Sequence, residues 1–257
     1  MTDFIPTSER QEQILARLKQ QGRVSVAEIV ALFSISEATA RRDLEALASE
    51  GKLQRVHGGA LALHQAPPEP PILQRESWQK DEKQRIGQAA ARLIQDGETI
   101  FLGSGTTVLE VARNLTTRKD LTVITNSLPV MTMFSKLQGI AVVALGGFLR
   151  KSELSFIGHI TEQSIRDLRA DKVIIGIHAI SLEHGLTNDY LEETMTDRAI
   201  LEMGRQVLLV ADHTKFGVVS MSFVAEPEKV NTIVTDTGVP PKFIEALRGK
   251  NIEIIQV

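Results

Sequence analysis

The sequence predicts two domains: a small, mainly helical domain at the N-terminus and a larger α/β domain built on a mostly parallel sheet. Residues 1–63 hold three short helical patterns followed by a Gly-Gly hairpin. Residues 64–78 contain four prolines, which separate the two parts. From about residue 79, runs of strand length alternate with helical patterns, which is typical of a parallel sheet covered by helices on both faces.

The composition indicates a folded protein without a membrane partner. Of the 257 residues 42% are hydrophobic, which is enough for a core, and no apolar run approaches the length of a membrane span. The N-terminus lacks the features of a signal peptide, so we expect a cytoplasmic protein. Because there is no cysteine and the six histidines are scattered, we expect neither a metal site nor a cofactor.

The N-terminal domain takes its three helices from apolar spacing and from helix caps. Apolar residues from Ile14 to Leu18 indicate the first helix. Ser25 and Glu28 have the spacing of a capping box, which starts the second helix. The third helix is expected to run from its cap Ser36 to about residue 49.

The third helix carries small and basic side chains on its outer face. Such a face lets the backbone approach a groove and lets paired arginines reach phosphates or guanine edges. The hairpin of residues 52–63 completes a winged helix-turn-helix, and its basic residues would reach the backbone or the minor groove. The alternatives are a solvated helix face and a protein-docking module. The residues expected to contact double-stranded operator DNA are Ser36, Ala38, Thr39, Arg41, Arg42, Arg55 and His57.

Net charge gives no support for DNA binding. The chain carries −3, and residues 1–63 hold as many acidic as basic side chains. The prediction therefore depends on where the arginines lie. With no surplus charge behind them, Arg41, Arg42 and Arg55 should carry a large share of a salt-sensitive affinity.

The proline-rich segment sets the predicted domain boundaries. We assign residues 1–63 to the DNA-binding domain, 64–78 to a linker and 79–257 to the second domain. Proline blocks helix and sheet pairing and favours extended geometry. The linker is either a semi-rigid connection that transmits domain orientation or a plain spacer.

The second domain is expected to hold seven strands, with helices between most of them. Ligands bind at the carboxyl ends of the strands in such sheets. The expected strands are residues 98–102, 121–125, 140–145, 172–177, 206–211, 232–235 and 252–256.

Polar residues follow several of these strands. Residues 104–107, Ser-Gly-Thr-Thr, join a strand to a helix, so backbone N–H groups, the helix dipole and hydroxyls suit a phosphate or carboxylate. Taken alone, this loop also fits a plain tight turn, and the other polar residues fit loop charges or helix caps. Their joint occurrence favours an anion-binding cleft. The residues expected to bind the effector are Ser104, Gly105, Thr106, Thr107, Asn126, Gly147, Arg150, Lys151, Glu193 and Lys215.

Motifs in both domains resemble the DeoR family of bacterial transcription regulators over nearly the whole chain. They are Ser34-x-Ser36-x-x-Thr39-x-Arg41-Arg42-Asp43-Leu44, Gly58-Gly59-Ala60, Ser104-Gly-Thr-Thr107, Thr125-Asn126, Gly146-Gly147-x-x-Arg150, Glu193 and Asp212-x-x-Lys215. The resemblance implies an effector domain similar in fold to ribose-5-phosphate isomerase and a phosphorylated sugar or related metabolite as effector. Two positions depart from the family pattern. Ala40 stands where isoleucine is usual, and His178 stands where a small or acidic residue is more frequent.

The favoured hypothesis is a DNA-binding repressor of a carbohydrate-metabolism operon, controlled by a phosphorylated sugar. Paired half-sites make a homodimer or homotetramer the expected assembly. The alternative is an isomerase-like enzyme with an attached DNA module, in which Asp212 and Glu193 act as acid and base beside Lys215. The sequence holds no constellation that demands catalysis, so we expect no enzyme. His178 either lines the pocket or is buried and bonded to backbone.

Overall fold

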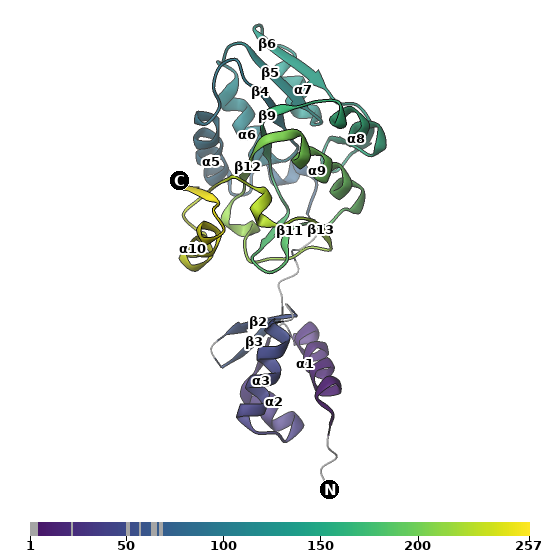
Figure 1. The fold of residues 1–257 in the computed structure, drawn as a ribbon, viewed down its shortest axis with the longest axis vertical. Coiled ribbons are helices and arrows are strands. Elements are labelled where there is room, and N and C mark those ends of the chain that lie inside the picture. Colours follow the sequence, from purple (N-terminus) through teal and green to yellow (C-terminus); the bar gives the residue numbers. More distant parts are fainter. Residues whose placement is uncertain (1–4, 22, 50–51, 57, 63–65, 67–68) are drawn as a thin grey trace. The chain divides into compact units, whose positions relative to one another are not determined.

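The computed structural model describes residues 5–21, 23–49, 52–56, 58–62, 66 and 69–257. The chain divides into two compact units, residues 1–65 and 66–257 (Figure 1). In the described part of the chain, no helix is long and apolar enough to cross a membrane.

The smaller unit holds three helices and a three-stranded antiparallel sheet of order β1-β3-β2. The sequence did not predict β1, which pairs with β3 across the wing hairpin. Gly58 turns the hairpin at φ +81°, and Gly59 lies so close to Val24 that a Cβ would come within 2.2 Å of its carbonyl oxygen. The elements are α1 Thr7–Gln21, β1 Arg23–Ser25, α2 Val26–Phe33, α3 Glu37–Ser49, β2 Leu53–Val56 and β3 Gly59–Ala62.

The core of the smaller unit combines apolar packing with one buried ion pair. Leu44 and Leu47 of α3 are fully buried, in agreement with the predicted inner face of this helix. Arg10 of α1 donates to Asp43 of α3 through Nε at 2.6 Å and Nη2 at 3.0 Å. Because both side chains are buried, the pair fixes how α1 packs against the base of α3.

The larger unit is an α/β domain with a seven-stranded, fully parallel sheet of order β15-β14-β12-β9-β4-β5-β6 (Figure 1). All seven strands correspond to predicted ones, so the predicted fold class is confirmed. The strands of this sheet are β4 Thr99–Leu102, β5 Leu121–Thr125, β6 Ile140–Ala144, β9 Ala170–Ile175, β12 Gly204–Val210, β14 Thr232–Thr235 and β15 Glu253–Gln256.

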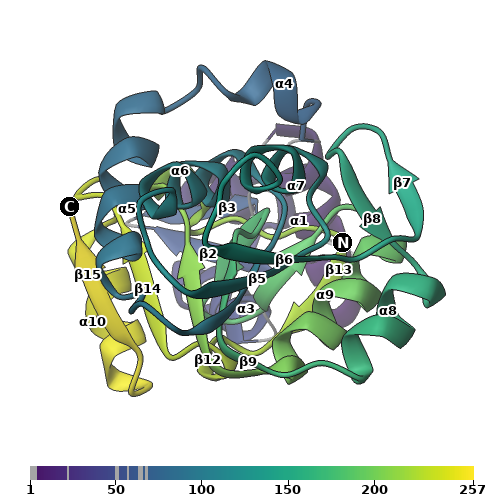
Figure 2. The ribbon, with the colours of Figure 1, turned by 90° about the horizontal axis from the view of Figure 1, so that it is seen from above.

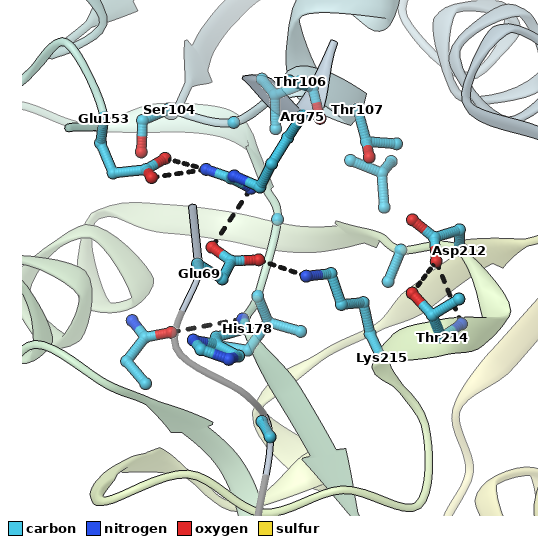
Figure 3. A pocket seen from close by; sticks show the side chains of 18 of the residues that line it. Glu69, Arg75, Ser104, Thr106, Thr107, Glu153, His178, Asp212, Thr214 and Lys215 are labelled. Carbon is cyan, nitrogen blue, oxygen red and sulfur yellow. Dashed lines mark hydrogen bonds and ion pairs between the residues drawn. The ribbon is translucent and has the colours of Figure 1, made fainter. Parts of the chain in front are cut away.

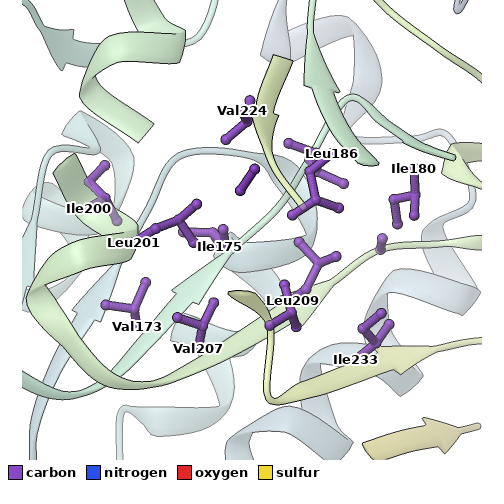
Figure 4. Packing of buried hydrophobic residues seen from close by; sticks show 14 of the residues in the cluster. Val173, Ile175, Ile180, Leu186, Ile200, Leu201, Val207, Leu209, Val224 and Ile233 are labelled. Carbon is purple, nitrogen blue, oxygen red and sulfur yellow. The ribbon is translucent and has the colours of Figure 1, made fainter. Parts of the chain in front are cut away.

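Helices cover both faces of the sheet, as the alternating burial along its strands requires (Figure 2). Ile174 and Leu208 point to the face covered by α5 and α6. Val173 and Leu209 point to the opposite face, where α9 and α10 pack (Figure 4). The helices are α4 Ile72–Arg75, α5 Lys80–Arg92, α6 Thr106–Leu115, α7 Leu128–Phe134, α8 His159–Arg166, α9 Leu191–Met203 and α10 Pro241–Gly249.

In the described part of the larger unit, five short antiparallel strands lie outside the central sheet, and none of these five was predicted. Two form a hairpin, and three form a small sheet of order β10-β11-β13. Strands of three or four residues are too short to show an alternating pattern. They are β7 Phe148–Arg150, β8 Ser155–Ile157, β10 Ala179–Ser181, β11 Gly185–Asn188 and β13 Ser222–Ala225.

The end of the proline-rich segment packs on the larger unit. Pro71 caps the short helix α4, where the missing N–H of proline has no cost. The backbone N–H of Ile72 donates to the carbonyl of Ser152 at 2.8 Å. Residues 69–78, predicted as part of a linker, therefore contribute side chains to the larger unit. The boundaries 1–63 and 79–257 remain a prediction.

Candidate functional site

A cavity of about 520 Å³ lies at the carboxyl ends of three neighbouring strands of the parallel sheet. Strand β9 lies between β4 and β12 in the sheet. The segments that follow these strands supply the cavity wall with residues 104–108 (the loop and the start of α6), residues 176–178, and Ala211, Asp212, Thr214 and Lys215. The strand order switches sides between β4 and β9, because β5 and β6 are added on one side of β4 and β9 and β12 on the other. Ligands of open α/β sheets bind at such a point.

The loop after β4 presents the N-terminus of α6 to the cavity. Gly105 precedes the helix at φ +111°, which allows the sharp entry. The first backbone N–H groups of a helix have no partner inside the helix and carry partial positive charge. The hydroxyl-bearing Thr106 and Thr107 form the first turn and line the cavity with Ser104. This end of the cavity therefore suits an anionic group.

A chain of ion pairs crosses the cavity (Figure 3). Lys215, which follows β12, contacts the carboxylate of Glu69 through Nζ. The second carboxylate oxygen of Glu69 lies 3.2 Å from Nη1 of Arg75. Arg75 in turn holds both carboxylate oxygens of Glu153 at 2.5 Å. The side chain of Glu69 is 15% exposed and that of Lys215 is 21% exposed, so this chain of charges is largely removed from water.

Carboxylates and an amide form another part of the wall. Burial raises the pKa of Glu193 to about 7 and outweighs the opposing effect of Arg150, which pairs with it. Asp189 lies 3.5 Å from the Nδ1 atom of His178, and this contact lowers the pKa of Asp189 to about 2. Asn188 lies nearby and accepts the backbone N–H of His178 at 3.3 Å. These oxygens are suited to accept hydrogen bonds from sugar hydroxyls.

The structure brings together six of the ten predicted effector residues. Ser104, Gly105, Thr106, Thr107, Glu193 and Lys215 all line the cavity. His178 was predicted either to line the pocket or to be buried and bonded to backbone. It is buried and also forms part of the cavity wall, so each alternative holds in part.

Four predicted effector residues do not line the cavity: Asn126, Gly147, Arg150 and Lys151. The hairpin β7–β8 explains this, because it covers the end of β5. Asn126 is buried there and donates through Nδ2 to the carbonyl of Phe156 at 3.0 Å. Arg150 reaches the wall indirectly. It pairs with Glu193, and its guanidinium carbon lies 4.4 Å from the ring centre of Tyr190.

Sequence reasoning missed several charged residues of the cavity. Glu69 and Arg75 lie in or beside the proline-rich segment, which gave no sign of folding onto the sheet. Lys83 of α5 also lines the cavity, and its Nζ donates to the carbonyl of Arg75 at 2.9 Å. Burial lowers the pKa of Lys83. The available signal in the sequence was a lysine on the apolar face of an amphipathic helix, a place where charged residues are rare unless they have a partner. Among the residues described here, no cluster of His, Asp and Glu is suited to hold a metal ion.

The outer face of α3 is the candidate DNA-binding surface. Ser36 caps the helix by accepting the backbone N–H of Thr39 at 3.2 Å, and its hydroxyl lies 2.9 Å from that of Thr39. Ala38, Arg41 and Arg42 are exposed, and Nη2 of Arg41 lies 3.3 Å from the carboxylate of Glu37, one turn earlier in the helix. This surface therefore combines a close-approach position with two available guanidinium groups.

The wing adds one further basic side chain. Arg55 of β2 is half-buried and donates through Nη1 to the carbonyl of Gly59 at 2.5 Å. This bond stiffens the hairpin and leaves other guanidinium N–H groups available. His57 lies outside the described residues.

Comparison with known proteins assigns both parts of the chain. Residues 10–66 match the DeoR-like helix-turn-helix domain, and residues 78–237 match the DeoR C terminal sensor domain. The chain is 35% identical over 247 residues to the glycerol-3-phosphate regulon repressor of Escherichia coli (strain K12), covering 96% of this chain and 98% of that one. It is 37% identical over 237 residues to the transcriptional repressor AccR of Agrobacterium fabrum, covering 91% and 92%.

The relatives named here are repressors, and the alternative prediction of an enzyme finds no support among them. Among solved structures, ribose-5-phosphate isomerase from Plasmodium falciparum is similar with a TM-score of 0.39 and 20% identity, covering 52% of each chain. The two family models together span most of the sequence, with the helix-turn-helix domain preceding the sensor domain. The chain belongs to the DeoR family of transcriptional regulators.

Proposed function

We propose that this regulator represses an operon of carbohydrate metabolism and that a phosphorylated sugar bound in the cavity controls its hold on operator DNA. The observation that carries the proposal is the cavity wall. It combines a helix N-terminus, Thr106 and Thr107 with the cations Lys215 and Lys83. Carboxylate and amide oxygens lie in the same wall. This combination matches a ligand with a phosphate at one end and hydroxyls at the other.

The names of related proteins support the same ligand class. One relative is named as the repressor of the glycerol-3-phosphate regulon. The loop of residues 104–107, with Lys215, is the proposed phosphate site, and Glu193 is a proposed hydroxyl acceptor. Asn126, Gly147, Arg150 and Lys151 are proposed to support this wall from behind.

The proposed DNA contacts lie on α3 and the wing. Ser36, Ala38 and Thr39 bring the helix N-terminus close to the major groove, as in other helix-turn-helix proteins. Arg41 and Arg42 are proposed to bind phosphates or base edges, and Arg55 and His57 to bind beside them. Two such surfaces on a homodimer or homotetramer would read two half-sites. Release of DNA requires the sugar to bind the free and DNA-bound states with unequal affinity.

Two variants separate the proposed sites. Thr106→Val keeps the shape of the side chain and removes its hydroxyl, so operator affinity should stay within about twofold while the sugar needed for release rises about tenfold or more. Arg42→Ala should weaken operator binding about tenfold or more and leave sugar binding unchanged. The measurements are mobility shift for operator and thermal shift for a panel of phosphorylated sugars. Normal release of operator from Thr106→Val would remove the loop from the site.

A further inference from the structure

The cation best placed for an anionic ligand already has an anionic partner from the same chain. Lys215 contacts Glu69, whose carboxylate also lies 3.2 Å from Arg75. Glu69 is part of the cavity wall together with Thr106 and Thr107. Figure 3 shows its carboxylate directed into the middle of the group formed by Arg75, His178 and Lys215. A ligand phosphate that used Lys215 would therefore meet the charge of Glu69.

Besides the ion pairs of Glu69, hydrogen bonds attach the described residues of this segment to the larger unit. The backbone N–H of Glu69 donates to Asp189 at 3.2 Å, and the carbonyl of Pro70 accepts Nε of Arg75 at 2.8 Å. Upstream, the backbone N–H of Ala66 donates to the carbonyl of Val219 at 2.8 Å. The side-chain ion pairs of Glu69 thus add to the backbone hydrogen bonds that hold Glu69 and Ala66 to the larger unit.

Charge decides the competition between Glu69 and a ligand. Lys215 and Arg75 lower the pKa of Glu69 and overcome the opposing effect of its burial, so its carboxylate carries one negative charge at neutral pH. A phosphate monoester carries about −1.5 to −2 at pH 7 and offers three acceptor oxygens. In the cavity it would also meet the partial positive charge at the N-terminus of α6. The electrostatic attraction between this site and a phosphate is therefore stronger than that between the site and the Glu69 carboxylate.

We propose that Glu69 is a built-in competitor that occupies the anion subsite of Lys215 and Arg75, and that a phosphate-bearing ligand displaces it. This inference rests on the proposed function and adds how ligand binding in the cavity affects the chain that leads to the DNA-binding domain. Glu69 closely follows residue 65, where the smaller unit ends. Displacement removes the ion pairs that hold Glu69 to the larger unit and so loosens the attachment of the chain that leads to the DNA-binding domain. Ligand binding and the state of the connection are thereby linked.

The first test measures inorganic phosphate binding to the full chain. Trp78, the single tryptophan, lines the cavity and serves as a fluorescent reporter. Glu69→Gln keeps the size of the side chain and removes the competing charge, so its Kd for phosphate should fall about tenfold. Glu245→Gln on the exposed face of α10 removes the same charge elsewhere and should leave the Kd within about twofold.

A double-mutant cycle assigns the effect to the ion pair. In the Lys215→Gln background the Glu69→Gln substitution should lower the Kd by a clearly smaller factor than in the wild type, because one of the two cations that Glu69 occupies is gone. An unchanged or weaker affinity of Glu69→Gln in the wild-type background would overturn the inference and leave the proposed function standing. Failure of phosphate, and of phosphorylated sugars, to bind any variant would overturn both.

Hydrogen exchange tests displacement without relying on any substitution. In the wild-type chain, saturating phosphate should speed amide exchange in peptides that cover residues 69–74, because the Glu69 N–H would leave Asp189. Exchange in peptides from α10 should stay constant. Unchanged or slower exchange in residues 69–74 would show that the segment stays in place, and would refute the displacement even if phosphate binds.

Discussion

Glu193 shows how a single side chain of the cavity wall ties stability to pH. Its carboxylate is 8% exposed and faces Arg150, Ser155, Glu153 and Glu69. Burial raises its pKa from 4.5 to about 7. The folded protein therefore holds the proton more tightly than the unfolded chain. The corresponding stability is fully present below the unfolded pKa and is lost as the pH rises through the folded pKa.

We expect the difference in unfolding free energy between wild type and Glu193→Gln to depend on pH. Between about pH 4.5 and about pH 8 the wild type should lose up to ~3 kcal/mol relative to the variant, which stays neutral throughout. Unfolding followed by Trp78 fluorescence measures the larger unit, which contains both residues. The exposed neighbour Glu192→Gln is the matched control and should show no such trend. A pH-independent difference for Glu193→Gln would contradict the raised pKa.

At the scale of the element, α3 carries two arginines that the fold leaves on its outer face. Each phosphate contact releases condensed counterions, so the slope of log K against log salt falls by about 0.9 for each contact that is removed. Arg41→Ala with Arg42→Ala should therefore flatten the slope for operator DNA by about 2. Arg248→Ala, an exposed arginine at the end of α10, should leave the slope unchanged.

Fluorescence anisotropy with a labelled operator duplex at several salt concentrations gives the slopes directly. A double variant with weaker binding but the wild-type slope would place these arginines on base edges alone. A double variant with unchanged affinity would remove α3 from the DNA-binding surface.

The central strands could be predicted because each contains a run of apolar residues and most of them alternate with helical patterns along the chain. Ile174 and Val173 alternate between two covered faces, and the apolar run that results marks the strand. The loop of residues 104–107 could be predicted for a related reason, since strand order places such loops at one end of the sheet. Both predictions rest on local sequence combined with a general rule of topology.

Contacts between distant segments could not be predicted. Arg10 and Asp43 form a buried pair 33 positions apart, and each looks like an ordinary charged helix residue in the sequence. Glu69 is hidden in the same way, because the prolines around it suggest an extended spacer. Arg150 was predicted to bind the effector, but in the structure it belongs to the hairpin β7–β8 and pairs with Glu193 without lining the cavity itself. Three-residue strands gave no signal for that hairpin.

At the scale of the whole molecule, control by a ligand must act in both directions. If a phosphorylated sugar lowers operator affinity about tenfold, a saturating operator must lower sugar affinity by the same factor. We expect the Kd for the sugar, measured by Trp78 fluorescence, to be about tenfold higher with a saturating operator duplex than without it. A duplex of equal length without the operator sequence should have a smaller effect. If the Kd for the sugar is the same with and without bound operator, the sugar does not act on the DNA-bound protein.

The ion pairs that close the cavity also set an order of events during synthesis. Glu69 and Lys215 are 146 positions apart, and Arg75 and Glu153 are 78 positions apart. The smaller unit, in contrast, finds all of its sheet partners within residues 23–62. Because local contacts form early and domains fold as they leave the ribosome, the DNA-binding unit is complete long before residue 215 is made. Each growing chain therefore passes through a stage in which the helix-turn-helix unit is folded and the cavity is not yet formed.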